Sequence, residues 1–218
     1  MPHQRLRFIE NWVKKMSSFW PIVGIVGLRQ VGKSTLLRDR LKIKNYLTLD
    51  DDDTRLEAQA SPGTFLARNE YQPTAIDEVQ KVPQLFDSIK ADVDRKRRPG
   101  KWYLSGSVAF SEKIGIRESL TGRIGLLHLY PMTLAEIEGK EMLRLGKTPF
   151  VQGAKCRFHS RDISKQMTLG GLPIPAFLRD ESVSEQYWRS WVETSTFRDA
   201  GKAFGRGFDP ERCSSLIR

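Results

Sequence analysis

One segment of the chain has the pattern of a phosphate-binding loop. Residues 27–34 match G-x-x-x-x-G-K-[ST], with an apolar run before them and a helical pattern after them, which disfavours a chance match in a glycine turn. Glycines let backbone N–H groups turn towards phosphate oxygens, and the N-terminus of the following helix adds partial positive charge. The lysine then reaches the β- and γ-phosphates, and the serine hydroxyl ligates magnesium. We expect ATP and Mg²⁺ to be bound by the loop and the residue after it: Gly27, Leu28, Arg29, Gln30, Val31, Gly32, Lys33, Ser34 and Thr35.

Two adjacent carboxylates, Asp77 and Glu78, end a short apolar stretch further along the chain. A loop of this kind needs one carboxylate for the magnesium shell and one to orient the attacking water. We expect Asp77 to serve the metal with Ser34, and Glu78 to be the catalytic base. Adjacent residues of a strand point to opposite faces, so both can act only if the strand ends there and the chain turns. The alternative is a surface acidic pair.

Two further polar segments could place a side chain beside the γ-phosphate. Residues 105–107 form the tip of an expected strand, where the Ser105 hydroxyl is placed to sense that phosphate; an ordinary turn is the alternative. Arg123 is a candidate arginine finger, supplied to the site of an adjacent subunit, and a structural ion pair is its alternative. With Lys33 and Glu78, these residues complete the expected catalytic set.

Four consecutive aspartates, residues 50–53, also invite a metal-binding interpretation. Aspartates are favoured at helix N-termini, where they accept backbone hydrogen bonds and interact well with the helix dipole. We therefore interpret the run as a helix cap and leave it out of the expected site.

The elements that must position these residues alternate between strands and helices. Apolar runs predict strands at residues 22–26, 46–49, 72–78, 102–107 and 124–129. Apolar periodicity predicts helices within residues 1–19, from residue 34 onward, near 54–57 and over 83–93. This alternation favours an α/β fold with a parallel sheet covered on both faces, as in P-loop NTPases.

The pattern changes after Pro131. We expect a helix around residues 134–137, a weakly patterned basic stretch over 146–165, a turn at 170–173 and a helix at 184–198, with a domain boundary between 139 and 153. The predicted parts are an N-terminal helix (1–20), an ATPase core (21–140) and a small, mainly helical C-terminal part (141–218).

Four segments of the chain resemble the prokaryotic AAA-type ATPase family with an uncharacterised C-terminal domain. They are residues 27–34, 76–80, 104–107 and 119–123. The resemblance covers about residues 19–138, and residues 170–173 with 188–199 are similar to the start of that C-terminal domain. It implies an ASCE-class P-loop core with Glu78 as the base, and ATP rather than GTP. Family members are usually much longer, so the resemblance also implies an incomplete C-terminal domain here.

Composition limits the other function classes. Of 218 residues, 39% are hydrophobic, the mean hydropathy is −0.45, and no stretch approaches the roughly 20 apolar residues of a membrane helix. The N-terminal residues lack the apolar block of a secretory signal, so we expect a cytoplasmic protein without a membrane partner. The two cysteines, Cys156 and Cys213, lack the spacing of a zinc site or a disulfide framework.

The net charge of +10 favours contact with polyanions. The basic run 95–98 is a candidate nucleic-acid contact, but cations are also stabilised at a helix C-terminus, which is the favoured alternative. The expected partner is ATP, with nucleic acid and a homo-oligomer as weaker hypotheses. Three functions compete: a hydrolysing switch or motor, a small-molecule kinase, and a nucleic-acid-binding module with a degenerate ATPase. Glu78 favours the first, because a carboxylate placed to activate water favours hydrolysis. A kinase needs an acceptor pocket and a lid of arginines, which the sequence does not identify.

Overall fold

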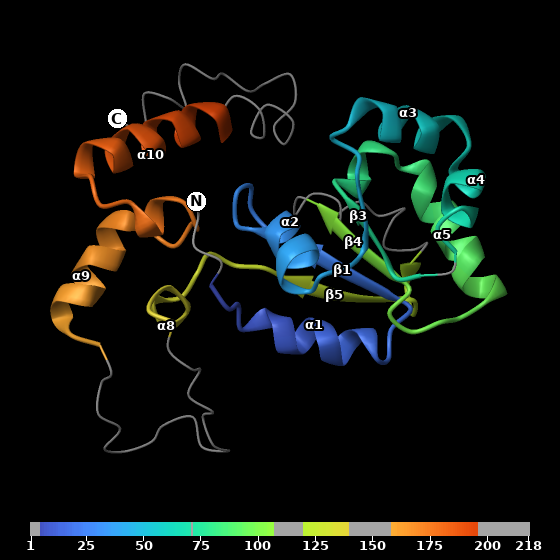
Figure 1. Ribbon diagram of the computed structural model, residues 1–218, viewed down its shortest axis with the longest axis horizontal. Helices are drawn as coiled ribbons and strands as arrows, with labels where there is room; N and C mark the ends of the chain where they lie inside the picture. Colours follow the sequence, from blue (N-terminus) through green and yellow to red (C-terminus); the bar gives the residue numbers. More distant parts are fainter. Residues whose placement is uncertain (1–4, 71, 107–119, 140–157, 196–218) are drawn as a thin grey trace. The chain divides into compact units, whose positions relative to one another are not determined.

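A parallel sheet forms the centre of the first of two units. The computed structural model describes residues 5–70, 72–106, 120–139 and 158–195, and the chain divides into units of residues 1–155 and 156–218. The sheet has the order β2-β3-β4-β1-β5, and every pairing is parallel (Figure 1). Its strands are β1 (Ile22–Val26), β2 (Asn45–Thr48), β3 (Thr74–Asp77), β4 (Trp102–Gly106) and β5 (Ile124–His128). The predicted α/β fold is confirmed.

Helices connect and cover these strands. They are α1 (Ile9–Ser17), α2 (Lys33–Thr35) continued by the π-helix η1 (Leu36–Arg40), α3 (Asp52–Ala60), α4 (Pro62–Ala67), the 3₁₀-helix η2 (Val79–Lys81), α5 (Gln84–Arg95) and α8 (Leu134–Ile137). Helix α1 is shorter than expected, because residues 5–8 precede it without helical structure. No helix among the described residues is long and apolar enough to cross a membrane.

The two faces of the sheet are packed by different helices. Successive residues of a strand point to opposite faces, and Ile22 of β1 joins a core with Phe86 and Ile89 of α5. The other face meets α1, which lies beside β5 (Figure 1). A methyl group added at Gly125 would overlap the side chain of Met16. The sheet is therefore held between helices, and the loops at its carboxyl edge are left to carry the site.

The aspartate run at 50–53 caps a helix. Asp51 lies just before α3, and its carboxylate accepts a hydrogen bond from the backbone N–H of Thr54 at 2.9 Å. Asp52 forms an ion pair with Arg55 at 2.7 Å. Within the described residues, no three His, Cys, Asp or Glu side chains group as metal ligands. The capping interpretation is confirmed.

In the described part of the second unit, residues 158–195, two α-helices are joined through a short 3₁₀-helix. Its elements are α9 (Ser160–Leu169), the 3₁₀-helix η3 (Pro175–Phe177) and α10 (Glu181–Ser195). Gly170 ends α9 with a φ of +71°, and a methyl group there would lie 2.7 Å from the ring of Trp188. Helix α9 was not predicted, because its sequence lies mostly in the weakly patterned stretch. The tail, residues 196–218, lies outside the described residues.

Candidate nucleotide-binding site

The glycine motif forms a loop between β1 and α2, at the carboxyl edge of the sheet. Gly32 has a φ of +99°, a left-handed conformation that glycine adopts without steric cost, and caps α2. Gln30 also has a positive φ, of 59°, which is uncommon for a residue with a side chain. Gly27 passes so close to β5 that a methyl group there would overlap the carbonyl oxygen of Leu129. The loop therefore has the left-handed backbone and the close packing that its glycines predict.

Lys33 lies inside this loop. The residue is 7% exposed, and its ammonium group donates hydrogen bonds to the carbonyl oxygens of Gly27, at 3.0 Å, and Leu28, at 2.9 Å. The cation is thus held within the loop whose backbone N–H groups are suited to phosphate binding. A phosphate bound there would add strong charge-assisted hydrogen bonds to this ammonium group.

Asp77 is the centre of the polar network beside the loop. Its Oδ2 accepts hydrogen bonds from the Ser34 hydroxyl, at 2.5 Å, and from the Tyr46 hydroxyl. Its Oδ1 accepts from the Ser105 hydroxyl and from the backbone N–H of Glu78, at 3.1 Å. The hydroxyl donors come from α2, β2 and β4, whereas the carboxylate ends β3. Four elements that are far apart in sequence are therefore joined at one carboxylate.

The position of β4 explains why Ser105 reaches this network. Strand β4 lies between β1 and β3, and Ser105 is opposite Ile25 of β1 in the register. Its side chain is fully buried and donates to Asp77. The ordinary-turn alternative does not describe Ser105, which belongs to a paired strand. Ser107 lies outside the described residues.

Tyr46 is a site residue that the sequence did not reveal. Burial, followed by its hydrogen bond to Asp77, raises the pKa of Tyr46 well above its ordinary value, because both favour the protonated hydroxyl that donates to this carboxylate. The guanidinium carbon of Arg38 lies 5.9 Å from the centre of the tyrosine ring. Tyr46 belongs to the predicted strand 46–49, but nothing in the local pattern indicated a polar partner for it.

Glu78 stands where the chain turns. Strand β3 ends at Asp77, and Glu78 adopts φ 55° and ψ 39°, a left-handed conformation, before η2 begins. Its Oε2 accepts a hydrogen bond from Nε2 of Gln80 at 2.5 Å. The strand therefore ends and turns as the two-carboxylate hypothesis required. Left-handed non-glycine residues cost of order 1 to 3 kcal/mol and cluster at functional sites.

The residues present fit a magnesium ion bound together with nucleotide phosphates. Mg²⁺ prefers oxygen ligands and is commonly held by one or two protein groups, phosphates and water rather than by a cage of carboxylates. The Ser34 hydroxyl and the Asp77 carboxylate are adjacent oxygen donors of this kind. Asp77 is 3% exposed, so its side-chain oxygens face these neighbouring groups rather than bulk water.

Arg123 lies away from this network. It immediately precedes β5 and so lies at the amino edge of the sheet, about 15 Å along the strand from the carboxyl edge. Its guanidinium binds Asp94 through two contacts, of 2.6 and 2.9 Å. This geometry matches the ion-pair alternative and gives Arg123 no access to the loop of its own chain. A role in an adjacent subunit stays a prediction.

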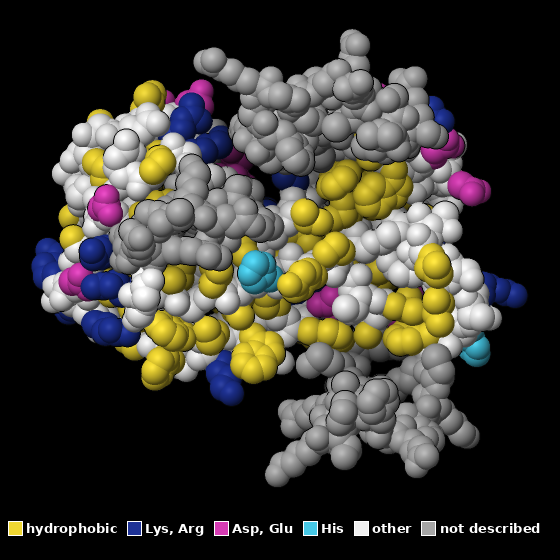
Figure 2. All heavy atoms as spheres, turned by 180° about the vertical axis from the view of Figure 1, so that it is seen from behind, with side chains coloured by type: hydrophobic (Ala, Val, Ile, Leu, Met, Phe, Trp, Pro, Cys, Tyr) yellow, Lys and Arg dark blue, Asp and Glu magenta, His cyan; other side chains and the backbone are white. Residues whose placement is uncertain are grey.

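The basic run at the end of α5 is largely engaged with its neighbours. Arg95 pairs with Asp92 at 2.9 Å, Arg98 with Glu70 at 3.7 Å, and Arg97 donates to a backbone carbonyl oxygen. On the face shown in Figure 2, Lys and Arg side chains gather at one edge with acidic side chains among them. The contacts of Arg95, Arg97 and Arg98 agree with a helix C-terminus stabilised by its cations. Nucleic-acid binding stays a hypothesis.

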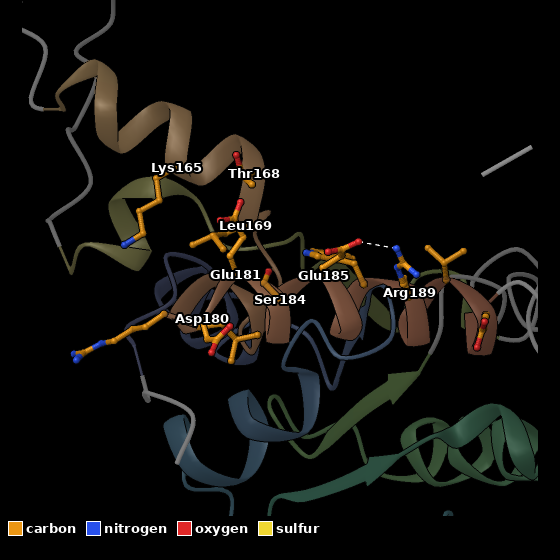
Figure 3. Close-up of a pocket in the computed structure, with 13 residues that line it drawn as sticks. Lys165, Thr168, Leu169, Asp180, Glu181, Ser184, Glu185 and Arg189 are labelled. Carbon is orange, nitrogen blue, oxygen red and sulfur yellow. Dashed lines mark hydrogen bonds and ion pairs between the residues drawn. The ribbon is translucent and has the colours of Figure 1, made fainter. Parts of the chain in front are cut away.

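A separate hollow lies within the second unit, between α9 and α10. Its volume is about 1260 Å³. Figure 3 shows side chains of both signs around it, and the one ion pair marked there joins Glu185 and Arg189 at 2.7 Å. All of its lining residues lie between 165 and 193, so this hollow shares no residue with the phosphate-binding loop.

Comparisons with known proteins agree with this geometry. A family model described as an AAA domain matches residues 20–138. Uncharacterised proteins of Mycobacterium bovis and Mycobacterium tuberculosis are each 35% identical over 130 residues, covering 57% of this chain and 28% of the relative. The chain therefore matches less than a third of the length of these relatives. A Walker-type ATPase of Pyrococcus abyssi has a similar fold, with a TM-score of 0.52 at 14% identity, over 93% of this chain and 78% of that protein.

Proposed function

The chain belongs to the AAA-domain family of P-loop ATPases, and from that premise we propose that it binds Mg-ATP in the loop 27–34 and hydrolyses it. The observation that carries the proposal is the contact of 2.5 Å between the Ser34 hydroxyl and Asp77, beside a loop that encloses Lys33. These are the groups that magnesium and the β- and γ-phosphates require. Magnesium, when bound, neutralises charge that develops on the phosphates.

Each side chain of the site has a separate task in this proposal. Lys33 binds the β- and γ-phosphates, while Ser34 and Asp77 hold the metal. Glu78 accepts a proton from the attacking water, and Ser105 orients Asp77 and responds to the γ-phosphate. The left-handed turn at Glu78 supports its role, because it separates this carboxylate from Asp77, its neighbour in sequence.

Hydrolysis would make the chain a switch or motor module acting on a partner of unknown identity. A small-molecule kinase is the alternative activity. The two differ in the product: hydrolysis releases inorganic phosphate without an acceptor, whereas a kinase transfers the phosphoryl group to one. The carboxylate of Glu78 supports hydrolysis.

The direct test is the substitution Lys33→Ala in the purified 218-residue chain, with Mg-ATP binding measured by calorimetry. Hydrogen bonds to charged groups contribute about 1.5 to 3 kcal/mol, so affinity is expected to fall about 10- to 100-fold. Lys96→Ala is the matched control, because Lys96 is an exposed lysine that follows α5. It removes the same charge from the chain without touching the loop.

Two results would overturn this proposal. Equal affinity of Lys33→Ala and Lys96→Ala for Mg-ATP would remove the loop from nucleotide binding. Release of no phosphate by the unaltered chain, together with phosphorylation of an added acceptor, would replace hydrolysis by the kinase alternative.

A further inference from the structure

Arg7 is a buried arginine that lies before α1 and outside the residues matched by the AAA-domain model. It is 7% exposed. Its three guanidinium nitrogens donate to three different acceptors: Nε to Glu136 at 3.2 Å, one terminal nitrogen to the carbonyl oxygen of Val31 at 2.9 Å, and the other to that of Tyr130 at 2.6 Å. One of these acceptors, Val31, belongs to the phosphate-binding loop.

The contact with Val31 fixes the orientation of one peptide unit in the loop. In a trans peptide the C=O and the following N–H lie in one plane and point in opposite directions. A guanidinium that holds the Val31 carbonyl oxygen on its own side therefore directs the N–H of Gly32 to the other side. Gly32 begins the turn into α2 and has the left-handed φ of 99°. Backbone N–H groups at this turn are the ones suited to phosphate oxygens.

Glu136 holds the guanidinium in place. Its Oε1 accepts from Arg7 Nε and, at 2.7 Å, from the backbone N–H of Phe8. Its Oε2 accepts from the backbone N–H of Thr133 at 2.9 Å, which completes the cap of α8. Glu136 is 5% exposed, so both charges of the pair are desolvated and depend on each other. The planar fork of arginine can serve Glu136, Val31 and Tyr130 at once, whereas a lysine ammonium cannot match that geometry.

We infer that Arg7 is a positioning residue of the phosphate-binding loop, which holds the Val31–Gly32 peptide in the orientation that phosphate needs. This inference rests on the proposed Mg-ATP binding. The residue that orients the loop therefore belongs to the N-terminal segment, more than 20 positions before Val31 in sequence.

The test compares Arg7→Lys with Arg98→Lys. Arg98 is also partly buried and also pairs with a glutamate, Glu70 at 3.7 Å, but this pair lies at the amino edge of the sheet. Two quantities are measured: the affinity for Mg-ATP by calorimetry, and amide hydrogen exchange of residues 27–36 in the nucleotide-free protein. For Arg7→Lys we expect affinity to fall about three- to tenfold, from the loss of one or two hydrogen bonds, and exchange to accelerate in the loop but not in β4. Arg98→Lys should change neither quantity.

Several results would overturn the inference. The first is that Arg7→Lys changes neither amide exchange in the loop nor affinity for Mg-ATP. The second is that the two lysine variants have equal effects. The third is that exchange accelerates evenly over β1 and β4, which would mean that Arg7 stabilises the fold alone. If the unaltered chain binds no Mg-ATP, the proposed function fails, and loop exchange in nucleotide-free Arg7→Lys still decides the positioning role. If Arg7→Lys does not fold, the neutral pair Arg7→Gln with Glu136→Gln replaces it, because it leaves no buried charge without its partner.

Discussion

Two buried aspartates, at opposite edges of the same sheet, have different surroundings. Asp77, 3% exposed, ends β3 at the carboxyl edge and accepts from three hydroxyl groups and one backbone N–H. Asp92, 8% exposed, lies in α5 near the amino edge and accepts from the indole N–H of Trp102, at 2.8 Å, and from Arg95. A hydroxyl group can accept as well as donate, so it can stay beside a carboxylate that binds a metal ion. An indole N–H and a guanidinium can only donate.

The charged side chains show the same division. Left-handed backbone does not separate the edges, because it occurs at Gln30, Gly32 and Glu78 and also at Lys42, Gly100 and Gly122, which precede strands. At the carboxyl edge, the Lys33 ammonium donates to two backbone carbonyl oxygens of the loop. The amino edge has charges matched within the chain, such as Arg123 with Asp94. Residue type alone therefore does not distinguish a carboxylate of the proposed site from one that pairs within the fold. The end of the strand at which the residue lies and the chemistry of its donors differ between the two aspartates.

The largest expected effect lies at the carboxyl edge. Glu78→Gln should retain Mg-ATP affinity and lose about 10²- to 10⁴-fold in turnover, because an amide can hold the attacking water but cannot accept its proton. Release of inorganic phosphate under single-turnover conditions measures this effect. Glu70→Gln, a glutamate paired with Arg98 at the other edge, is the control and should turn over normally. Normal turnover in Glu78→Gln would assign the base elsewhere and break the comparison.

An intermediate effect, on stability alone, is expected at the amino edge. Asp92→Ala leaves the buried N–H of Trp102 without an acceptor, which should lower the free energy of unfolding by about 1 to 3 kcal/mol. Urea denaturation measures this change, and Asp94→Ala, an exposed aspartate of the same helix, should unfold close to the unaltered chain. Mg-ATP affinity should not change in either variant. A loss of affinity in Asp92→Ala with unchanged stability would show that the two edges are not separate in function.

The smallest expected effect belongs to Arg123. Arg123→Ala should leave the Mg-ATP affinity of its own loop unchanged, because the guanidinium lies at the other edge of the sheet. Calorimetry on the isolated variant measures this affinity.

The same variant also tests the arginine-finger hypothesis. A finger acting between subunits is worth about 10³ to 10⁵ in rate. If Arg123→Ala lost turnover and mixing it with Lys33→Ala restored some, Arg123 would serve an adjacent subunit. Full turnover by Arg123→Ala alone would leave the ion pair as its role and sharpen the contrast between the edges.

The parts of the fold that could be predicted are those encoded locally. The loop 27–34 is a continuous motif between an apolar run and a helix, and the five strands alternate with helices, so a parallel sheet followed directly. The chain turn after Asp77 was also implied, by the need for both carboxylates to act. Helix α9 was missed because its apolar residues are few, and Ile163 and Met167 are exposed in the structure.

The parts that could not be predicted depend on contacts between distant residues. Tyr46 meets Asp77 across 31 positions, and Arg7 meets Glu136 across 129. Neither pairing has a local pattern. For Arg123, its place after residues 105–107 suggested an arginine finger for an adjacent subunit; within its own chain the residue precedes β5 and so lies at the amino edge of the sheet. Sequence order alone did not give that placement.

The close approach of Gly27 to the end of β5 affects how inherited variation at this position can be understood. A methyl group there would overlap the backbone oxygen of Leu129, which a change of rotamer cannot relieve. An alanine at position 27 would therefore displace the edge of the sheet before any nucleotide is bound. Loss of function in such an allele would therefore result from a displaced strand as well as from a lost contact with the ligand. Suppressor substitutions would be expected near Leu129 as well as in the loop.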